Sequence, residues 1–162
     1  MNARDMLGNT LDLAKMITDA YLGDLTDAEL LRRPAPGCNH IAWQLGHLIG
    51  SGCEMLAGLG KSGPTLPAGF AAAHSKETAG SDDPKQFLSK AEYLRLLDGL
   101  RDAAKSAVAS YSEADLGQPG PEAMRSYAPT IGAVLNLIGT HEIMHCGQWV
   151  PVRRALGKPV VM

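Results

Sequence analysis

Two histidines four residues apart are the first residues of this sequence that could do chemistry. His141 and His145 lie in the segment 130–156, whose apolar residues recur at steps of three and four, a pattern that predicts a helix. Residues four apart on a helix project from the same face, about one turn apart. That face is the apolar one, because Ile138 and Val152 share its stripe. Both imidazoles are therefore expected to point into the protein.

An inward pair of imidazoles has two interpretations. Gln148 follows on the same stripe, so several polar atoms need partners in the core, where an unpaired group costs roughly 1 to 3 kcal/mol. A shared metal ion would satisfy both imidazoles at once, and helical zinc sites use this spacing. Ordinary hydrogen bonds within the core would satisfy them too. The pattern favours a metal site over a purely structural pair.

The run from His141 to His145 also matches the H-E-x-x-H signature of zinc peptidases, with Glu142 in the place of the general base. Such enzymes commonly take a third ligand from further along the chain, yet residues 146–162 contain no His, Asp or Glu. No alternating strand pattern offers an edge to an extended peptide. A peptidase is therefore disfavoured, and Glu142 is expected to be solvated or paired with a basic residue.

Four long helical segments must position these groups. Their apolar stripes predict helices that end at Gly23, that run over 39–59 with Asn39 as N-cap, that span 93–111, and that begin at Thr130. With no convincing strand and one long connection between the second and third helices, the sequence predicts an all-α, antiparallel-type four-helix bundle. The length suits one domain, residues 1–162.

Bundles build metal sites from side chains on facing helices, so the second helix is the place to look for a third ligand. His47 lies there, but its spacing places it at the edge of the buried face, beside Gln44. By periodicity alone, His47 is a boundary residue rather than a ligand. Trp43, one turn earlier, is expected to be a pocket wall or plain core. His74, in the long connection, is expected to be solvated.

Composition narrows the class of protein. With 15 basic and 17 acidic residues and a net charge of -2, nothing electrostatic favours nucleic acid or an anionic membrane as a partner, and a small-molecule substrate fits better. We expect no signal peptide or membrane span. The cysteines form no C-x-x-C pair and are expected to pack rather than to bind metal, in a cytoplasmic protein. They are Cys38, Cys53 and Cys146.

The sequence resembles the DinB-like (YfiT-like) superfamily of metal-dependent four-helix proteins. The matching pieces are residues 39–48, residues 141–148 and the closing run 153–159. The tryptophan followed four residues later by a histidine, Trp43 and His47, is moderately specific, and its combination with the second piece is a strong signature. With the segments between them, the likeness covers nearly the whole chain.

The resemblance implies that His47, His141 and His145 are the three ligands of one divalent metal ion. It implies a bundle in up-down-down-up order, which would account for the long connection. Relatives include enzymes that use a low-molecular-weight thiol, as S-transferases or as a maleylpyruvate isomerase. Members are often homodimers, so a homodimer is expected here.

Three neutral imidazoles suit zinc, nickel, iron or copper, of which zinc and nickel are expected first, and a three-ligand site keeps positions open for water or substrate. The preferred hypothesis is thiol activation, with the electrophile held under residues 60–86. Gln148 is a candidate for a hydrogen bond at the metal. Arg153 is a candidate contact for an anionic substrate, although a cation near a helix C-terminus is commonly there for the helix dipole.

Three other hypotheses remain open. One is metal-dependent hydrolysis of a small amide or ester, with Glu142 or another group as the base. A second is a non-catalytic, stress-associated or ligand-sensing bundle that binds a metal. The third is a metal-free bundle whose histidines are simply hydrogen-bonded.

Overall fold

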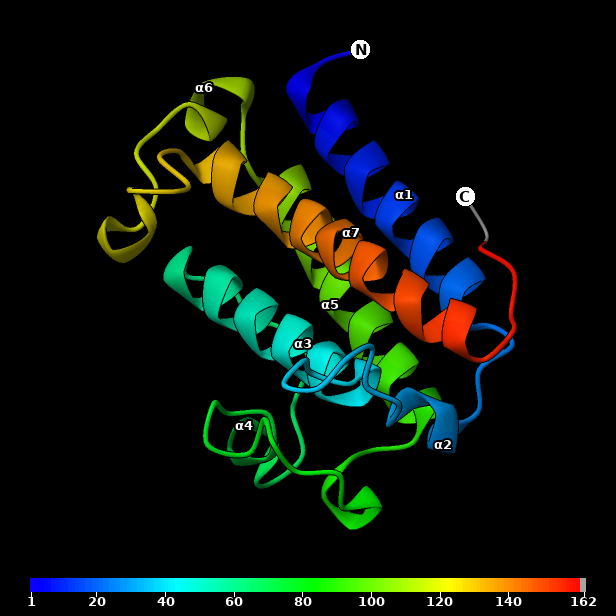
Figure 1. Ribbon diagram of the computed structural model, residues 1–162. Helices are drawn as coiled ribbons and strands as arrows, with labels where there is room; N and C mark the ends of the chain where they lie inside the picture. The colour runs from blue at the N-terminus through cyan, green and yellow to red at the C-terminus, as the bar shows by residue number, and fades with distance from the viewer. Residues whose placement is uncertain (161–162) are drawn as a thin grey trace.

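The computed structural model describes residues 1–160, and four long helices dominate it. They are α1 (Ala3–Leu22), α3 (Ile41–Gly58), α5 (Lys90–Ser110) and α7 (Ile131–Ala155). Helix α1 packs against α7 and α5, and α3 packs against the same two helices from the other side. Figure 1 shows that α1 and α7 run in one direction while α3 and α5 run in the other. The prediction of an all-α four-helix bundle in up-down-down-up order is confirmed.

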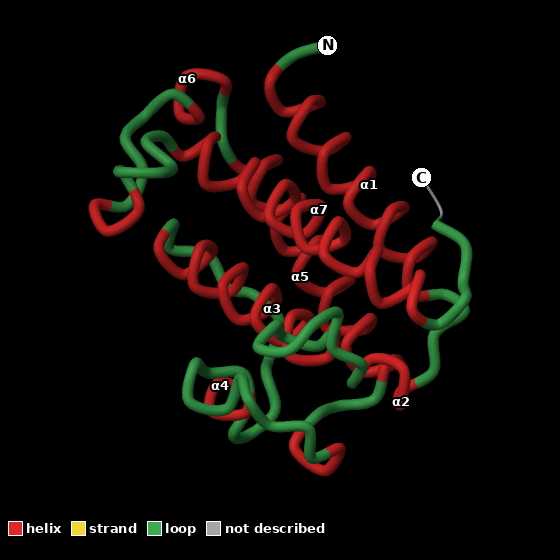
Figure 2. Tube along the Cα trace, in the orientation of Figure 1, coloured by secondary structure: helices red, strands yellow, loops and turns green. Residues whose placement is uncertain are grey.

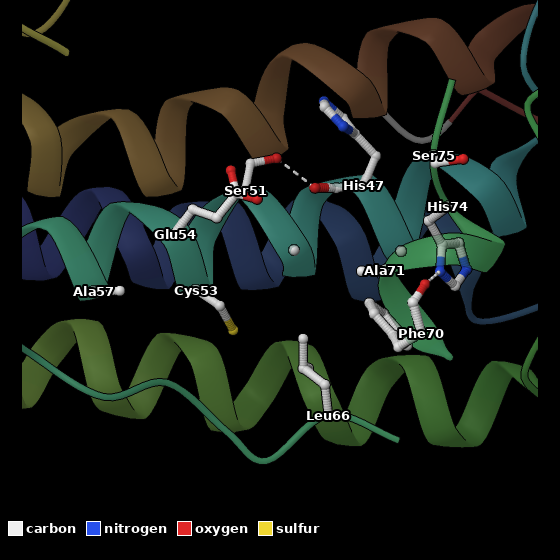
Figure 3. A pocket seen from close by; sticks show the side chains of 12 residues that line it. His47, Ser51, Cys53, Glu54, Ala57, Leu66, Phe70, Ala71, His74 and Ser75 are labelled. Carbon is white, nitrogen blue, oxygen red and sulfur yellow. Dashed lines mark hydrogen bonds between the residues drawn. The ribbon is translucent and has the colours of Figure 1, made fainter. Parts of the chain in front are cut away.

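Because α3 and α5 run in the same direction, the chain must return along the bundle between them. The crossover, residues 59–89, makes this return mostly as loop (Figure 2). Its side chains lie beside α3, as Phe70 and His74 do in Figure 3. This and the other connections contain short helices, which are α2 (Asp27–Leu30), α4 (Phe70–Ala73), η1 (Pro84–Gln86), α6 (Glu113–Leu116) and η2 (Glu122–Met124).

Side-chain caps fix where the long helices begin. The Thr130 side chain accepts from the backbone N–H of Ala133 and so starts α7 as predicted. The N-cap of α3 is His40 rather than the predicted Asn39, since the Nδ1 atom of His40 accepts from the backbone N–H of Trp43 at 3.0 Å. An imidazole nitrogen thus does the work usually done by a side-chain oxygen.

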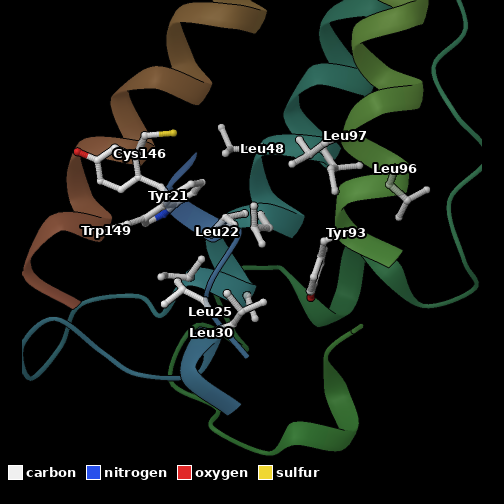
Figure 4. Packing of buried hydrophobic residues seen from close by; sticks show 14 of the residues in the cluster. Tyr21, Leu22, Leu25, Leu30, Leu48, Tyr93, Leu96, Leu97, Cys146 and Trp149 are labelled. Carbon is white, nitrogen blue, oxygen red and sulfur yellow. The ribbon is translucent and has the colours of Figure 1, made fainter. Parts of the chain in front are cut away.

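The apolar stripes meet in two clusters of buried side chains. One cluster gathers around Trp149 and Tyr93, together with Leu22 and Leu97 (Figure 4). The other lies toward α6 and includes Leu100. Burial of this apolar surface, at roughly 25 cal/mol per Å², is what holds the helices in the arrangement that the site needs. Within residues 1–160, no helix has the length and apolar character needed to cross a membrane.

Candidate metal centre

Three histidines come together between α3 and α7. One ring nitrogen from each of His47, His141 and His145 lies within 4.8 Å of the others, and no other such group of His, Cys, Asp or Glu forms among residues 1–160. The Nε2 atoms of His141 and His145 are 3.2 Å apart. Two ligands at about 2.1 Å from one metal ion lie roughly 3.0 to 3.4 Å apart at octahedral or tetrahedral angles, so this pair has the spacing of a metal chelate. His47 closes the third side, with its ring centroid 5.2 Å from that of His141.

Gln44 of α3 fixes the orientation of His145. Its Oε1 accepts from Trp149 Nε1 at 2.9 Å, and its amide nitrogen donates to the carbonyl of Asn39 at 2.8 Å. Since this oxygen is an acceptor, the Nδ1 atom of His145, 2.9 Å away, carries the ring proton of the neutral side chain. The lone pair is then on Nε2, the atom that faces His141. Metal-binding histidines are commonly held in this way through their other nitrogen.

Burial keeps the three imidazoles in the form that binds metal. The pKa of His145 falls to about 4, chiefly because burial penalises the charged ring and further because His141 and His47 are close. Burial also lowers the pKa of His141, with a contribution from His47, and the pKa of His47 itself. The neutral imidazole is the metal ligand, so few protons need to be displaced near neutral pH.

Trp43 supports His47 from the side. The indole is nearly parallel to the imidazole, at 8° with ring centroids 5.3 Å apart, and its Nε1 donates to the carbonyl of Ser75 at 3.1 Å. The side chain is only 7% exposed. Of the two predicted roles, Trp43 therefore fits packed core beside the cluster, and it ties the crossover to α3.

Glu142, the candidate base, is not placed for that role. Its carboxylate is buried in an ion pair with Arg101 of α5, whose Nε lies 3.2 Å from Oε2, and it accepts from the hydroxyl of Thr18 in α1. It is not part of the histidine cluster. A neighbouring residue on a helix points about 100° away, which turns Glu142 toward α1 and α5 while the histidines face α3. The predicted pairing with a basic residue is found, but solvation is not.

Gln148 and Arg153 do not have the surroundings that the sequence predicts for them. Gln148 is exposed, and the inward residue one turn after His145 is Trp149, so the placement of Gln148 on the inner stripe is wrong. Arg153 is 1% exposed and donates to both carboxylate oxygens of Asp24, at 2.6 and 3.2 Å. Its guanidinium joins the end of α7 to the loop after α1, and is not available to an anionic substrate.

His74 is buried rather than solvated. Its Nδ1 lies 2.8 Å from the carbonyl of Phe70, and its Nε2 lies 2.7 Å from the hydroxyl of Tyr93. A carbonyl only accepts, so Nδ1 carries the proton of the neutral ring and Nε2 accepts from Tyr93. The ring occupies the space that a side chain at Gly46 would need, because a Cβ there would be 1.9 Å from Cδ2 of His74. A glycine inside a helix was the one sequence signal for this contact.

The cysteines differ in their surroundings. Cys146 is buried with its sulfur 3.4 Å from the hydroxyl of Thr18, and burial raises its pKa to about 12, so it is an inert packing residue as expected. Cys53 is half-buried, and burial raises its pKa too. Cys38 is exposed, so for this residue the expectation of packing is wrong.

A groove of about 570 Å³ lies over α3 beside the cluster (Figure 3). Its floor includes Gly46 and Gly50, and residues of the crossover form one wall. Of the three clustered histidines, His47 is the one that lines the groove. Small-molecule sites commonly have volumes of about 300 to 1,000 Å³, so this groove has a suitable size. A molecule bound in it would lie beside His47.

The fold and the cluster together define a four-helix bundle with a candidate three-histidine metal site. The family model of the DinB superfamily matches residues 10–149, a stretch that contains all three histidines. The chain therefore belongs to the DinB superfamily, and the resemblance noted in the sequence is confirmed.

The comparison with solved structures agrees at the level of the fold. The crystal structure of the conserved protein of locus from Enterococcus faecalis is similar with a TM-score of 0.71 and 20% identity, covering 98% of this chain and 99% of that chain. Such a likeness shows a shared fold over the full length. A search of the curated proteins found no match.

Proposed function

We propose that this protein binds one divalent transition-metal ion through His47, His141 and His145, and that it transfers a low-molecular-weight thiol to a small electrophile. The observation that carries the metal proposal is the 3.2 Å spacing of the two Nε2 atoms on α7. Gln44 supports it, because it holds the proton of His145 on the far side of the ring. Membership of the DinB superfamily supports it independently.

The donor set suits zinc or nickel, and three protein ligands keep positions open for reactants. When bound, such an ion supplies Lewis acidity, which favours the deprotonated form of a thiol or of water. The protein's own contribution is to hold the imidazoles neutral and oriented, through burial, Gln44 and the stacked ring of Trp43. The groove beside His47 gives the electrophile a place next to the site.

Thiol transfer is favoured over hydrolysis by the position of Glu142. A hydrolase needs a group that takes a proton from water, and the carboxylate nearest in sequence is held by Arg101 and Thr18. A thiol is easier to deprotonate, since its ordinary pKa is about 8.5, and an adjacent cation alone can supply the thiolate. Among residues 1–160, no Asp or Glu belongs to the histidine cluster itself, and the carboxylate of Glu54 lines the neighbouring groove.

The proposal is tested with protein stripped of metal by a chelator and reloaded with zinc or nickel. Elemental analysis should find one ion per chain, and the reloaded protein should consume a model electrophile only when glutathione, mycothiol or bacillithiol is present. Thiol-independent cleavage of an ester or amide would instead support a hydrolase. Failure of the wild-type chain to retain either metal would overturn the site itself.

Glu142→Gln is the matched variant for the rival hydrolase hypothesis. It should keep the metal and the thiol-dependent activity in the folded protein, while the loss of one partner of a buried ion pair lowers stability by about 3 to 5 kcal/mol. Activity is therefore measured at a temperature where circular dichroism shows the variant folded. Loss of activity with full metal content would identify Glu142 as part of the chemistry.

A further inference from the structure

The groove over α3 has a feature that helix packing does not explain. Gly46 and Gly50 lie one turn apart in the middle of α3, where glycine is destabilising relative to alanine. At Gly46 the reason is visible, since the ring of His74 fills the space of the missing side chain. At Gly50, no atom of residues 1–160 lies within 4 Å of the position that a Cβ would occupy. The missing side chain at Gly50 leaves open space in the groove instead of admitting a neighbour.

The wall opposite His47 is apolar and fixed in place. Leu66 and Phe70 line it, and Phe70 belongs to the larger hydrophobic cluster, with an exposed fraction of 5%. The crossover that carries them is held to α3 by the bond from Trp43 to the carbonyl of Ser75. The groove is therefore formed before any ligand arrives, and a bound molecule meets little ordering cost.

The charges around the groove exclude one class of ligand. Among residues 1–160, no Lys or Arg lines the groove. The ring of His74 is neutral, because its Nδ1 donates to the carbonyl of Phe70 and its Nε2 accepts from the hydroxyl of Tyr93. Glu54, at the rim, is the one charged side chain among the lining residues. In the metal-free chain, an anionic group in the groove would therefore meet one carboxylate and no Lys or Arg side chain. Neutral and cationic groups meet no such penalty.

We propose that this groove binds a small, mainly apolar molecule without negative charge, and that Gly50 sets the size of the molecule admitted. This deepens the proposed function, on which it rests for the assignment of the groove to the electrophile. The binding itself depends on the groove alone. A ligand over Gly50 would lie between the apolar wall of Leu66 and Phe70 and the His47 edge.

The test uses two fluorescent probes that share one aromatic skeleton. N-phenyl-1-naphthylamine is neutral, and 8-anilino-1-naphthalenesulfonate is similar but anionic. Titrated into the full chain after chelator treatment, the neutral probe should bind at least about tenfold more tightly, a difference of about 1.4 kcal/mol. Glu54→Gln should narrow that difference by strengthening sulfonate binding.

Gly50→Leu should weaken binding of the neutral probe at least about tenfold, because the leucine side chain enters the open space in the groove. Gly8→Leu is the control, since Gly8 is also inside a helix with nothing within 4 Å of its Cβ position, and it should not change probe binding. Circular dichroism confirms folding of both variants. Equal binding by wild type and Gly50→Leu, or tighter binding of the sulfonate, overturns the proposal.

The two proposals fail in different measurements. Probe binding by the metal-free chain that depends on Gly50 supports the groove even if no metal is retained. A chain that retains one metal ion, yet binds the neutral probe equally with and without the Gly50→Leu change, keeps the metal site and loses the groove proposal.

Discussion

The five histidines of this chain fall into two groups that differ in where their ring nitrogens find partners. His40 and His74 each have both nitrogens occupied by the protein. In His40, Nδ1 accepts from a backbone N–H and Nε2 lies 3.1 Å from the carbonyl of Ser81. In His74, a carbonyl and a tyrosine hydroxyl take the two nitrogens. Each of these rings connects the crossover to the bundle.

The three clustered histidines instead bring ring nitrogens close to one another. In His145, Nδ1 donates to Gln44, and Nε2 faces the Nε2 of His141. Because the Nε2 of His145 then carries no proton, the two facing nitrogens hold at most one proton between them. The ring of His47 faces the same point. The comparison teaches that burial does not mark a histidine as functional. Ring nitrogens that converge on one point, with the other nitrogen of His145 held by Gln44, are what distinguish this candidate metal site.

The largest expected effect tests whether the cluster is a metal site at all. His145→Ala should weaken zinc binding at least about a thousandfold, because loss of a supporting contact alone typically costs 10- to 100-fold and this change removes a ligand. Competition with a chromophoric chelator measures the affinity. A His145→Ala protein that binds zinc as well as the wild type would place the metal elsewhere or remove it from the function.

The second expectation concerns the structural group. His74→Ala should lower the free energy of unfolding by about 2 to 3 kcal/mol, since it empties the space over Gly46 and removes the acceptor of Tyr93. Its zinc affinity should stay close to that of the wild type. Urea unfolding of the metal-free protein measures the first quantity. A His74→Ala chain with unchanged stability and impaired zinc binding would show that the structural and the clustered histidines do not differ in function.

A third, smaller effect on zinc affinity should distinguish Gln44, which contacts His145, from the exposed Gln148. Gln44→Leu keeps the approximate volume but removes the acceptor for His145, and should weaken zinc binding about 10- to 100-fold. Gln148→Leu is the matched control, because Gln148 is exposed and should leave the affinity unchanged. Equal effects of the two substitutions would mean that the orientation of His145 does not depend on Gln44.

Much of the fold could be predicted because helix periodicity and caps are local. The stripe of α1, its end at Gly23 and the cap of α7 at Thr130 follow from residues within a few positions of each other. The predicted N-cap of α3 is one residue too early, also for a local reason. Asparagine is the commoner capping residue, but the imidazole of His40 caps the helix in place of Asn39.

The site could be predicted only in part, because its decisive contacts join distant segments. His141 and His145 follow from their spacing, but spacing placed His47 at a boundary, and only the family resemblance grouped it with the other two. The role of Gln44 cannot be predicted from spacing, because its partners, His145 and Trp149, are more than 100 residues away. Periodicity also cannot decide between neighbouring positions at the edge of a stripe, which is why the sequence pattern favours Gln148 although Trp149 is the buried residue.

The smallest expected effect is a pH dependence of the free energy of unfolding that comes from His74, one of the structural histidines. Burial lowers the pKa of His74 below its ordinary value of 6.5, so between that value and the lower pKa of the folded state the unfolded chain binds a proton that the folded chain does not. The contribution of the neutral ring to stability is therefore full above pH 6.5 and falls as the pH drops below it, by at most about 1.4 kcal/mol per pH unit. His74→Gln abolishes this loss, so the stability difference between wild type and variant should shrink as the pH falls from 7 toward 5. Because the clustered histidines are present in both metal-free proteins, their titration cancels in that difference. A gap that stayed constant from pH 7 to pH 5 would show that folding does not shift the pKa of His74.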